Sequence, residues 1–178
     1  MHRVFAALLV GLAAMASAGE PQFRADPSHS GVYDAAGVPV LHGVKWKFRA
    51  KGPIVSSPAV SGASVFFGSS DHNVYAVDQA SGALRWKFAT HGRITASPAV
   101  AGGTVYIGSF DGNFYALDAA SGALRWKFAT EGERRFAARH LHGAEPAAET
   151  MPDPFDLFLS SPVVSGDTVY FGSGDGNV

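Results

Sequence analysis

Short hydrophobic runs alternate along the chain with turns made of glycine, aspartate, asparagine and serine. Short runs rich in Val, Phe, Tyr and Trp are typical of β-strands. The pattern predicts strands over 57–60, 64–68, 74–77, 84–89, 97–100, 104–108, 114–117 and 124–129. The tripeptides Asp71-His72-Asn73 and Asp111-Gly112-Asn113 suit tight hairpin turns, so neighbouring strands are expected to be antiparallel.

Polar and apolar residues alternate most clearly in segment 45–51, which reads KWKFRAK. Trp46, Phe48 and Ala50 would point to one side of an extended strand, and the four basic residues to the other. This predicts one buried face and one solvated face. Lysines at the edge of a sheet also discourage pairing with another sheet. We therefore interpret the basic residues as a solvated edge and expect no nucleic-acid partner.

The chain repeats itself at a regular spacing. Trp46, Trp86 and Trp126 are equally spaced, and segments 76–90 and 116–130 are identical at 13 of 15 positions. A third copy begins at Ser161-Pro162, later than this spacing requires, which places an insertion at about 131–159. Four short antiparallel strands in each repeat of about 40 residues describe a blade of a β-propeller, whereas solenoid repeats are shorter and sandwiches do not repeat so closely.

The repeats therefore predict an all-β fold: a β-propeller of four-stranded antiparallel blades over 45–178, incomplete in this chain. Before it, we expect a signal peptide over 1–18 and a segment leading into the propeller over 19–44. The third copy stops at Val178, at the position of Phe114. Because a ring needs four to eight blades, the natural protein is expected to continue further.

One element of the repeat carries a family resemblance. The pattern Ala-x-Asp-x-x-Ser-Gly-x-x-x-Trp occurs at 76–86 and again at 116–126, and it resembles the tryptophan-docking motif of pyrroloquinoline-quinone-like (PQQ-like) repeat propellers. Propellers of the WD type would show Trp-Asp, whereas lysine follows every tryptophan here. The resemblance implies that each tryptophan packs on the neighbouring blade, with structural roles for Ala76, Asp78, Gly82, Trp86, Ala116, Asp118, Gly122, Trp126 and Trp46.

Segment 1–18 has the pattern of an export signal. A basic start is followed by an apolar run over 4–15 and by Ala16-Ser17-Ala18, so cleavage is expected after Ala18. This apolar run is short for a membrane span, and the rest of the sequence contains no apolar run of greater length. No transmembrane segment is therefore expected. The predicted location is the periplasm.

Charge and cysteine content narrow the function classes. The chain has 14 basic and 15 acidic residues, a net charge of −1, which gives no general attraction to nucleic acid or to anionic membranes. It has no cysteine, which excludes a disulfide, a thiolate nucleophile, a cysteine-bound metal and a lipid anchor on cysteine. Its recurring aspartates are explained by turns, so no catalytic or metal-binding residue is assigned.

The insertion is the part of the propeller region that does not repeat. It contains a basic cluster that suits a phosphate, a carboxylate or an acidic partner segment. Two of these residues, His140 and His142, would share one face of a strand. Two histidines alone are weak evidence for a metal. A short helix over 134–141 is the structural alternative. The candidate partner-binding residues are Arg134, Arg135, Arg139, His140 and His142.

Two functions remain open at this point. The first is a non-enzymatic periplasmic scaffold that binds a protein partner or a ligand on a propeller face. The second, implied by the family resemblance, is the N-terminal part of a PQQ-dependent dehydrogenase that oxidises alcohols or sugars. No cofactor can be assigned from this sequence, and PQQ with calcium is expected only under the second hypothesis.

Overall fold

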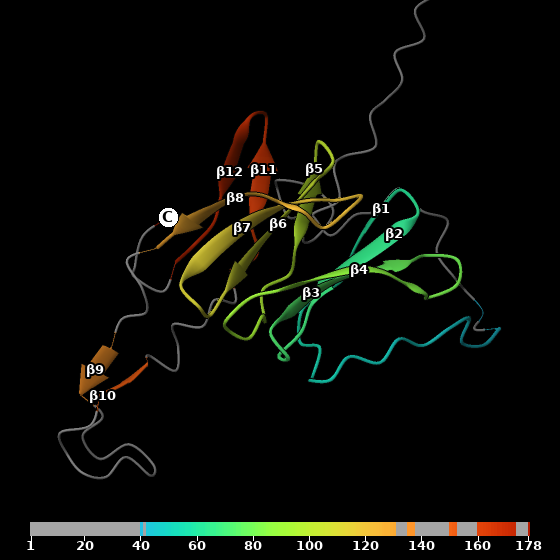
Figure 1. Ribbon diagram of the computed structural model, residues 1–178, viewed down its shortest axis with the longest axis horizontal. Helices are drawn as coiled ribbons and strands as arrows, with labels where there is room; N and C mark the ends of the chain where they lie inside the picture. The colour runs from blue at the N-terminus through green and yellow to red at the C-terminus, as the bar shows by residue number, and fades with distance from the viewer. Residues whose placement is uncertain (1–39, 41, 131–134, 138–149, 153–159, 174–177) are drawn as a thin grey trace, which may run out of the picture.

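The computed structural model describes residues 40, 42–130, 135–137, 150–152, 160–173 and 178, and the described residues form strands, turns and loops without a helix. Two four-stranded sheets stand side by side, and a short hairpin of a third repeat follows (Figure 1). The described residues contain no helix that is long and apolar enough to span a membrane.

The first sheet contains β1 (Ala59–Ser61), β2 (Ser64–Gly68), β3 (Asn73–Asp78) and β4 (Leu84–Ala89) in that spatial order. The second contains β5 (Ala99–Ala101), β6 (Thr104–Ser109), β7 (Asn113–Asp118) and β8 (Leu124–Ala129), again in chain order. All neighbours are antiparallel. The predicted strands are thus confirmed, with bounds shifted by at most two positions at any end.

The turns behave as their composition predicts. His72 and Gly112, in the two β-hairpins that join the middle strands, have φ angles of 71° and 80°. This left-handed region is the one that hairpin turns use, and it favours glycine or a polar residue. Between β3 and β4 the register shifts after Ala76, and between β7 and β8 it shifts at the equivalent Ala116. The two blades therefore share even their irregularities.

Each sheet buries both faces of its two middle strands along most of their length. The core between the sheets joins Phe66, Val74 and Trp86 of the first blade to Ile107 and Leu117 of the second. At the inner ends of the blades, β1 lies beside β5 and β5 lies beside β11 of the third repeat. This succession of inner strands is the arrangement of propeller blades around an axis.

Segment 45–51 packs on the outer face of the first sheet, where Trp46, Phe48 and Ala50 cover a second core cluster. The predicted alternation is confirmed, since these three residues are partly buried and the basic residues between them are exposed. However, the segment has no strand partner among the described residues. In β8, by contrast, buried and exposed residues do not alternate, because every residue is exposed.

The third repeat contributes β11 (Val163–Ser165) and β12 (Thr168–Tyr170). Within the insertion, β9 (Arg135–Ala137) pairs with β10 (Thr150–Pro152) in an antiparallel hairpin. The alternative of a helix over 134–141 is therefore wrong at 135–137, because an antiparallel partner at 150–152 satisfies the backbone of this stretch instead. The remainder of that range lies outside the described residues.

Candidate functional site

The repeated residues come together along the seam between successive blades. Each seam joins the outer strand of one blade to two turns of the next blade. One is the turn that follows the third strand of the next blade, and the other is the hairpin that connects the second and third strands of the next blade. Segment 45–51 and the first blade form one seam. The first and second blades form the other, with β4 in place of segment 45–51.

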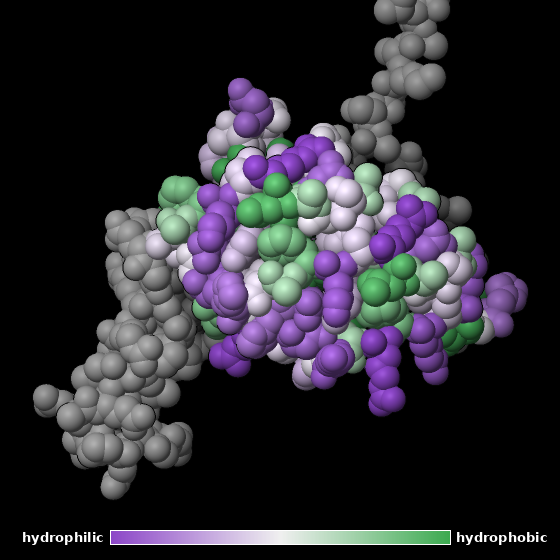
Figure 2. Space-filling model, viewed as in Figure 1, coloured by the Kyte–Doolittle hydropathy of each residue, from purple (hydrophilic) through white to green (hydrophobic). Residues whose placement is uncertain are grey.

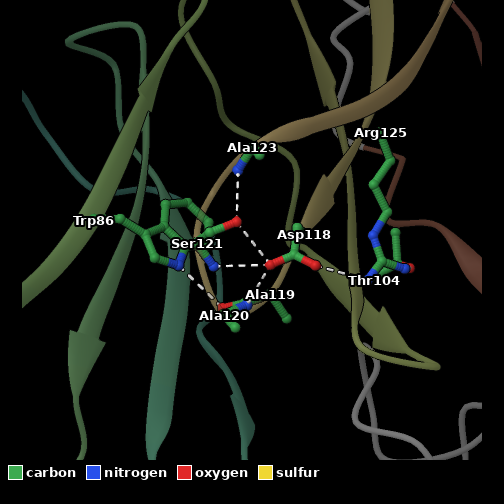
Figure 3. Close-up of polar contacts among 8 residues, drawn as sticks. All are labelled: Trp86, Thr104, Asp118, Ala119, Ala120, Ser121, Ala123 and Arg125. Atoms are coloured by element: carbon green, nitrogen blue, oxygen red, sulfur yellow. Dashed lines mark hydrogen bonds and ion pairs between the residues drawn. The ribbon is translucent and has the colours of Figure 1, made fainter.

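The turn after the third strand is organised by one aspartate. Asp118 Oδ1 accepts hydrogen bonds from the Ala120 nitrogen at 3.1 Å and from the Ser121 nitrogen and hydroxyl at 2.8 Å each, while Oδ2 contacts Arg125 Nη2 at 2.7 Å (Figure 3). The bonds from Arg125 and then Ser121 hold the pKa of Asp118 far below its usual range. Because the carboxylate satisfies three donors within its own turn, its role there is structural.

Asp78 organises the equivalent turn of the first blade in the same way. Its Oδ1 accepts from the Ser81 nitrogen at 2.9 Å and from the Ser81 hydroxyl at 2.8 Å, and its Oδ2 lies 2.6 Å from Arg85 Nη2. Arg85 and then Ser81 hold the pKa of Asp78 far below its usual range. Both turns end in a glycine with φ of 74°, Gly82 and Gly122.

A tryptophan of the preceding blade lies against each of these turns. Trp86 Nε1 donates a 3.0 Å hydrogen bond to the Ala119 carbonyl (Figure 3), and a Cβ on Gly122 would lie 2.6 Å from its Cδ2. Trp46 makes the same contacts one repeat earlier: Nε1 donates to the Gln79 carbonyl at 2.9 Å, and a Cβ on Gly82 would lie 2.6 Å from its Cδ2. Only glycine leaves room for the indole ring at this distance.

The third tryptophan has a different environment. Trp126 is 42% exposed, whereas Trp86 is 9% exposed. Among the described residues, its ring contacts are with Tyr106 and Phe114 of its own blade. The small Ala76 and Ala116 lie directly opposite Trp86 and Trp126 in the sheets, and both are fully buried.

The hairpin of each blade forms the second half of the seam. Asp111 Oδ2 accepts a 2.9 Å hydrogen bond from the His91 nitrogen, just after the outer strand of the first blade, and a 2.7 Å bond from the Tyr115 hydroxyl. Asp71 accepts the equivalent bonds from the Lys51 nitrogen at 2.9 Å and from the Tyr75 hydroxyl at 2.7 Å. One carboxylate thus fixes both its own blade and the backbone of the preceding one.

These carboxylates and phenols perturb each other. Burial alone would raise the pKa of Asp71, but the hydrogen bonds that it accepts outweigh burial and hold its pKa below the ordinary value. Asp111 follows the same balance. Burial, followed by the bond to the aspartate, raises the pKa of Tyr75 to about 12, and that of Tyr115 is raised by the same causes. Each pair therefore stays a neutral phenol donating to a charged carboxylate at physiological pH.

A phenylalanine that lies two positions after each tryptophan also crosses the seam. The Phe48 ring lies 5.3 Å from that of Tyr75, and the Phe88 ring lies 5.5 Å from that of Tyr115, both edge to face. In the third repeat, Phe128 meets Phe171 at 6.1 Å. Edge-to-face ring pairs of this kind stabilise beyond the area that they bury.

Sequence reasoning missed part of this seam. It assigned Asp71 and Asp111 to turns but did not find their tyrosine partners or their bonds to the preceding blade. The signal was present, because an aspartate is followed by a tyrosine at the same short spacing in both copies. It also missed Gly52 and Gly92, where a Cβ would collide with the backbone nitrogens of Asp71 and Asp111.

The insertion cluster is only partly within the described residues. Arg134, Arg139, His140 and His142 lie outside them, and the Arg135 backbone forms part of β9. In the described part of the chain, no group of three or more His, Cys, Asp or Glu side chains could hold a metal ion. The aspartates of the seams and turns each accept hydrogen bonds from other residues of the fold. These aspartates therefore do not form the ligand set of a calcium-quinone site.

Comparison with known proteins follows the geometry of the seams. A model of the family described as outer membrane protein assembly factor BamB matches residues 42–178. The crystal structure of BamB from Moraxella catarrhalis is similar at 31% identity, with a TM-score of 0.44, over 48% of this chain and 26% of that protein. No curated protein matches the chain in sequence.

Two oxidoreductases are also similar in structure. A europium-containing methanol dehydrogenase matches at 20% identity and a TM-score of 0.50, over 73% of this chain and 22% of the enzyme. A quinohemoprotein alcohol dehydrogenase from Comamonas testosteroni matches at 26% identity and a TM-score of 0.41, over 47% of this chain and 14% of the enzyme. The chain thus aligns with about a quarter or less of each of these proteins. The methanol dehydrogenase likeness shows the fold alone, which is the predicted β-propeller.

Proposed function

The chain belongs to the family of PQQ-like repeat propellers described as outer membrane protein assembly factor BamB, and from this premise we propose that it is a non-enzymatic scaffold that binds or assembles a protein partner. The family description supports a role in the assembly of outer membrane proteins, and with it an exported protein acting in the periplasm. The predicted signal peptide, cleaved after Ala18, agrees with this location.

One observation carries the proposal: the chemistry-bearing residues that recur in each blade are used to hold blades together. Asp111 accepts a hydrogen bond from the backbone after β4, and Asp118 accepts hydrogen bonds within its own turn. Trp86 of the preceding blade donates a hydrogen bond to that turn. We propose that the docking residues predicted from the sequence act in this structural way. A rigid array of blades then leaves the outer strands and the insertion to recognise a partner.

The insertion is proposed as one partner-binding region. Its basic residues, two of them histidines, would recognise an acidic segment through charge-assisted hydrogen bonds. The test is chemical cross-linking of the full chain in the cell envelope, followed by identification of the cross-linked protein. Replacing Arg134, Arg135 and Arg139 together by glutamine should reduce this product. An undiminished product would remove the insertion from the binding surface, and a chain that cross-links to no envelope protein would contradict the scaffold role.

The alternative, an N-terminal part of a PQQ-dependent dehydrogenase, makes an opposite prediction. A protein that binds the quinone in its folded state is stabilised by it, so its melting temperature rises with ligand concentration. We expect no shift when PQQ and calcium are added together, and no dye reduction with alcohols or sugars. A shift of several degrees that requires both additions, accompanied by dye reduction, would establish the dehydrogenase instead.

Export is tested separately. The mature protein isolated from the periplasm should begin at Gly19, as measured by intact mass. A mass that retains residues 1–18 in the exported protein would contradict cleavage after Ala18.

A further inference from the structure

The hairpin of the second blade contains an aspartate followed directly by a glycine, Asp111-Gly112. Gly112 has no Cβ, so nothing on this residue shields its backbone nitrogen from the carboxyl carbon of the neighbouring side chain. At the equivalent position of the first blade, His72 adopts a similar φ of 71° but carries a side chain. The two hairpins therefore share their geometry but differ in the chemistry that this nitrogen can undergo.

An aspartate in this setting rearranges without an enzyme. The Gly112 nitrogen attacks Asp111 Cγ, a C–N bond forms, the nitrogen loses its proton, and one water leaves, which closes a five-membered succinimide. One water then adds to either ring carbonyl and breaks one C–N bond. Opening at Cγ restores aspartate, whereas opening at the main-chain carbonyl gives isoaspartate, in which the chain runs through the former side chain. The water lost in the first step is regained in the second, and nothing is oxidised or reduced.

The folded hairpin holds the attacking residue in place. The Gly112 nitrogen donates a 3.1 Å hydrogen bond to the Ser109 carbonyl. The Gly112 carbonyl accepts hydrogen bonds from the nitrogen and from the hydroxyl of Thr130, at 2.9 Å each. Attack requires this nitrogen to rotate toward Asp111 Cγ and to give up its proton. Because the glycine is bonded on both sides, the closed hairpin opposes both changes.

The seam holds the carboxylate that would be attacked. Asp111 Oδ2 accepts bonds from the His91 nitrogen of the preceding blade at 2.9 Å and from the Tyr115 hydroxyl at 2.7 Å, and Oδ1 accepts from the Asn113 nitrogen at 3.0 Å. Burial alone would raise the pKa of Asp111, but these bonds hold it below the ordinary value. A charged carboxylate is a poor target for a nucleophile, because its oxygen leaves as water only after protonation. The contact with the preceding blade therefore keeps Asp111 both fixed and unreactive.

We propose that Asp111-Gly112 is a latent modification site, protected while the seam between the first and second blades is closed and converted to isoaspartate when that seam opens. In Figure 2, the described side chains pack into one continuous body, without a visible opening between the blades on this face. Proteins nevertheless open locally, and an interface between repeats is a natural place for such opening. The inference rests on neither candidate function, because both contain this seam.

The modification would prevent the seam from closing again. Isoaspartate has one more carbon in the main chain than aspartate, and one fewer between the main chain and the carboxylate. The shorter arm no longer brings one carboxylate oxygen to both the His91 nitrogen and the Tyr115 hydroxyl, which Asp111 Oδ2 contacts in the closed seam. A chain that has reacted therefore stays open at this position.

The first test measures isoaspartate at position 111 of the full chain after incubation at neutral pH. Proteolysis, chromatography and electron-transfer fragmentation distinguish isoaspartate from aspartate in peptides of equal mass. The folded wild type should react at least about tenfold more slowly than the same chain in urea, because only open molecules react. Gly112→His, which copies the hairpin of the first blade, should react little in either condition. Equal rates in the folded and unfolded wild type, or an undiminished rate in unfolded Gly112→His, would overturn the proposal.

The second test opens the seam selectively. Trp86→Ala removes the indole bond to the second blade, and Phe88→Leu removes the milder ring contact with Tyr115. Both should accelerate the reaction in the folded chain, Trp86→Ala by about tenfold or more. The matched variants Trp126→Ala and Phe128→Leu change the outer strand of the second blade and should have a smaller effect. Thermal melts identify the variants that remain folded, and Phe88→Leu serves alone if Trp86→Ala does not fold. Equal acceleration in the matched variants would overturn the proposal, because the opening would then not be that of this seam.

The third test measures whether the seam closes after the reaction. Wild-type chains kept in urea until isoaspartate has formed at position 111, and then refolded, should melt at a lower temperature than chains refolded at once. Gly112→His should show no such difference, and it controls for reaction at the other Asp-Gly pair, Asp175-Gly176, which lies outside the described residues. Identical melts of reacted and unreacted wild type, or an equal decrease in Gly112→His, would overturn the proposed loss of closure.

Discussion

Replacing Trp86 with alanine removes a contact that joins the first and second blades. The side chain is 9% exposed, its indole lies against Gly122, and its Nε1 donates to the Ala119 carbonyl. Because these partners belong to the next blade, the change acts on the interface and leaves each sheet's own ladder intact. Stability of a repeat array is roughly the sum of such interface terms and of the terms within each repeat. The array should therefore lose stability at this seam.

The chain contains a matched control for this substitution. Trp126 stands in the same local sequence but is 42% exposed, against 9% for Trp86, and its ring contacts among the described residues lie within its own blade. The two side chains thus differ in exposure by about a third of the residue surface. For a tryptophan of roughly 250 Å², this third is about 80 Å², or about 2 kcal/mol at about 25 cal/mol per Å². The lost indole hydrogen bond adds about 1 kcal/mol.

The assay is urea unfolding of the two alanine variants, followed by far-ultraviolet circular dichroism so that the missing indole does not affect the signal. Trp86→Ala should lower the free energy of unfolding by about 3–5 kcal/mol, the usual cost of removing a buried tryptophan. Trp126→Ala should cost about 2–3 kcal/mol less than that. Equal losses in the two variants would refute the reasoning, because the destabilisation would then come from within the blade and not from the seam.

Three further predictions concern the same seams. Gly122→Ala should destabilise more than Gly62→Ala in thermal melts, because both glycines have positive φ but only the first places a Cβ against an indole, whereas the second meets nothing within 4 Å. The contribution of Tyr75 to stability should be complete below about pH 10 and be lost as the pH rises toward its pKa of about 12, because the phenol of the unfolded chain ionises first. Thermal melts of the wild type and of Tyr75→Phe over a range of alkaline pH measure this contribution. Identical pH profiles for the two proteins would contradict it. Asp111→Ala should cost about 2 kcal/mol in urea unfolding by removing the acceptor of four donors, while the exposed Asp167→Ala should cost almost nothing.

Local features of this fold were predictable because local chemistry determines them. The strands follow from runs of β-branched and aromatic residues, and the hairpins from residues such as His72 and Gly112 that adopt positive φ. The regular period of the repeat then indicates blades, because no single blade buries its own faces. The helix considered over 134–141 failed at 135–137 because pairing with 150–152 depends on a contact that spans the insertion and leaves no local trace.

The seam itself was predictable only in part. Trp86 and Gly122 were identified because their segment resembles the tryptophan-docking motif of PQQ-like repeat propellers. The bond from the Lys51 nitrogen to Asp71 had no such pattern, since a backbone donor can belong to any residue type. The exposure of β8 was also unpredictable from its sequence, which is identical to that of β4, because burial depends on what lies across the seam.

The construction of the seam bears on how such a protein evolves. Each blade carries the tryptophan that reaches forward and the turn that receives the tryptophan behind it, so both halves of every contact lie within one repeat unit. Duplication of that unit in the gene adds a blade whose two sides already fit its neighbours, with no compensating mutation elsewhere. The near identity of 76–90 and 116–130 is the trace expected of such a duplication. Exposed side chains of the outer strands, such as Lys87 of β4, are not among the residues that form the seam, so selection can change recognition there without disturbing the array.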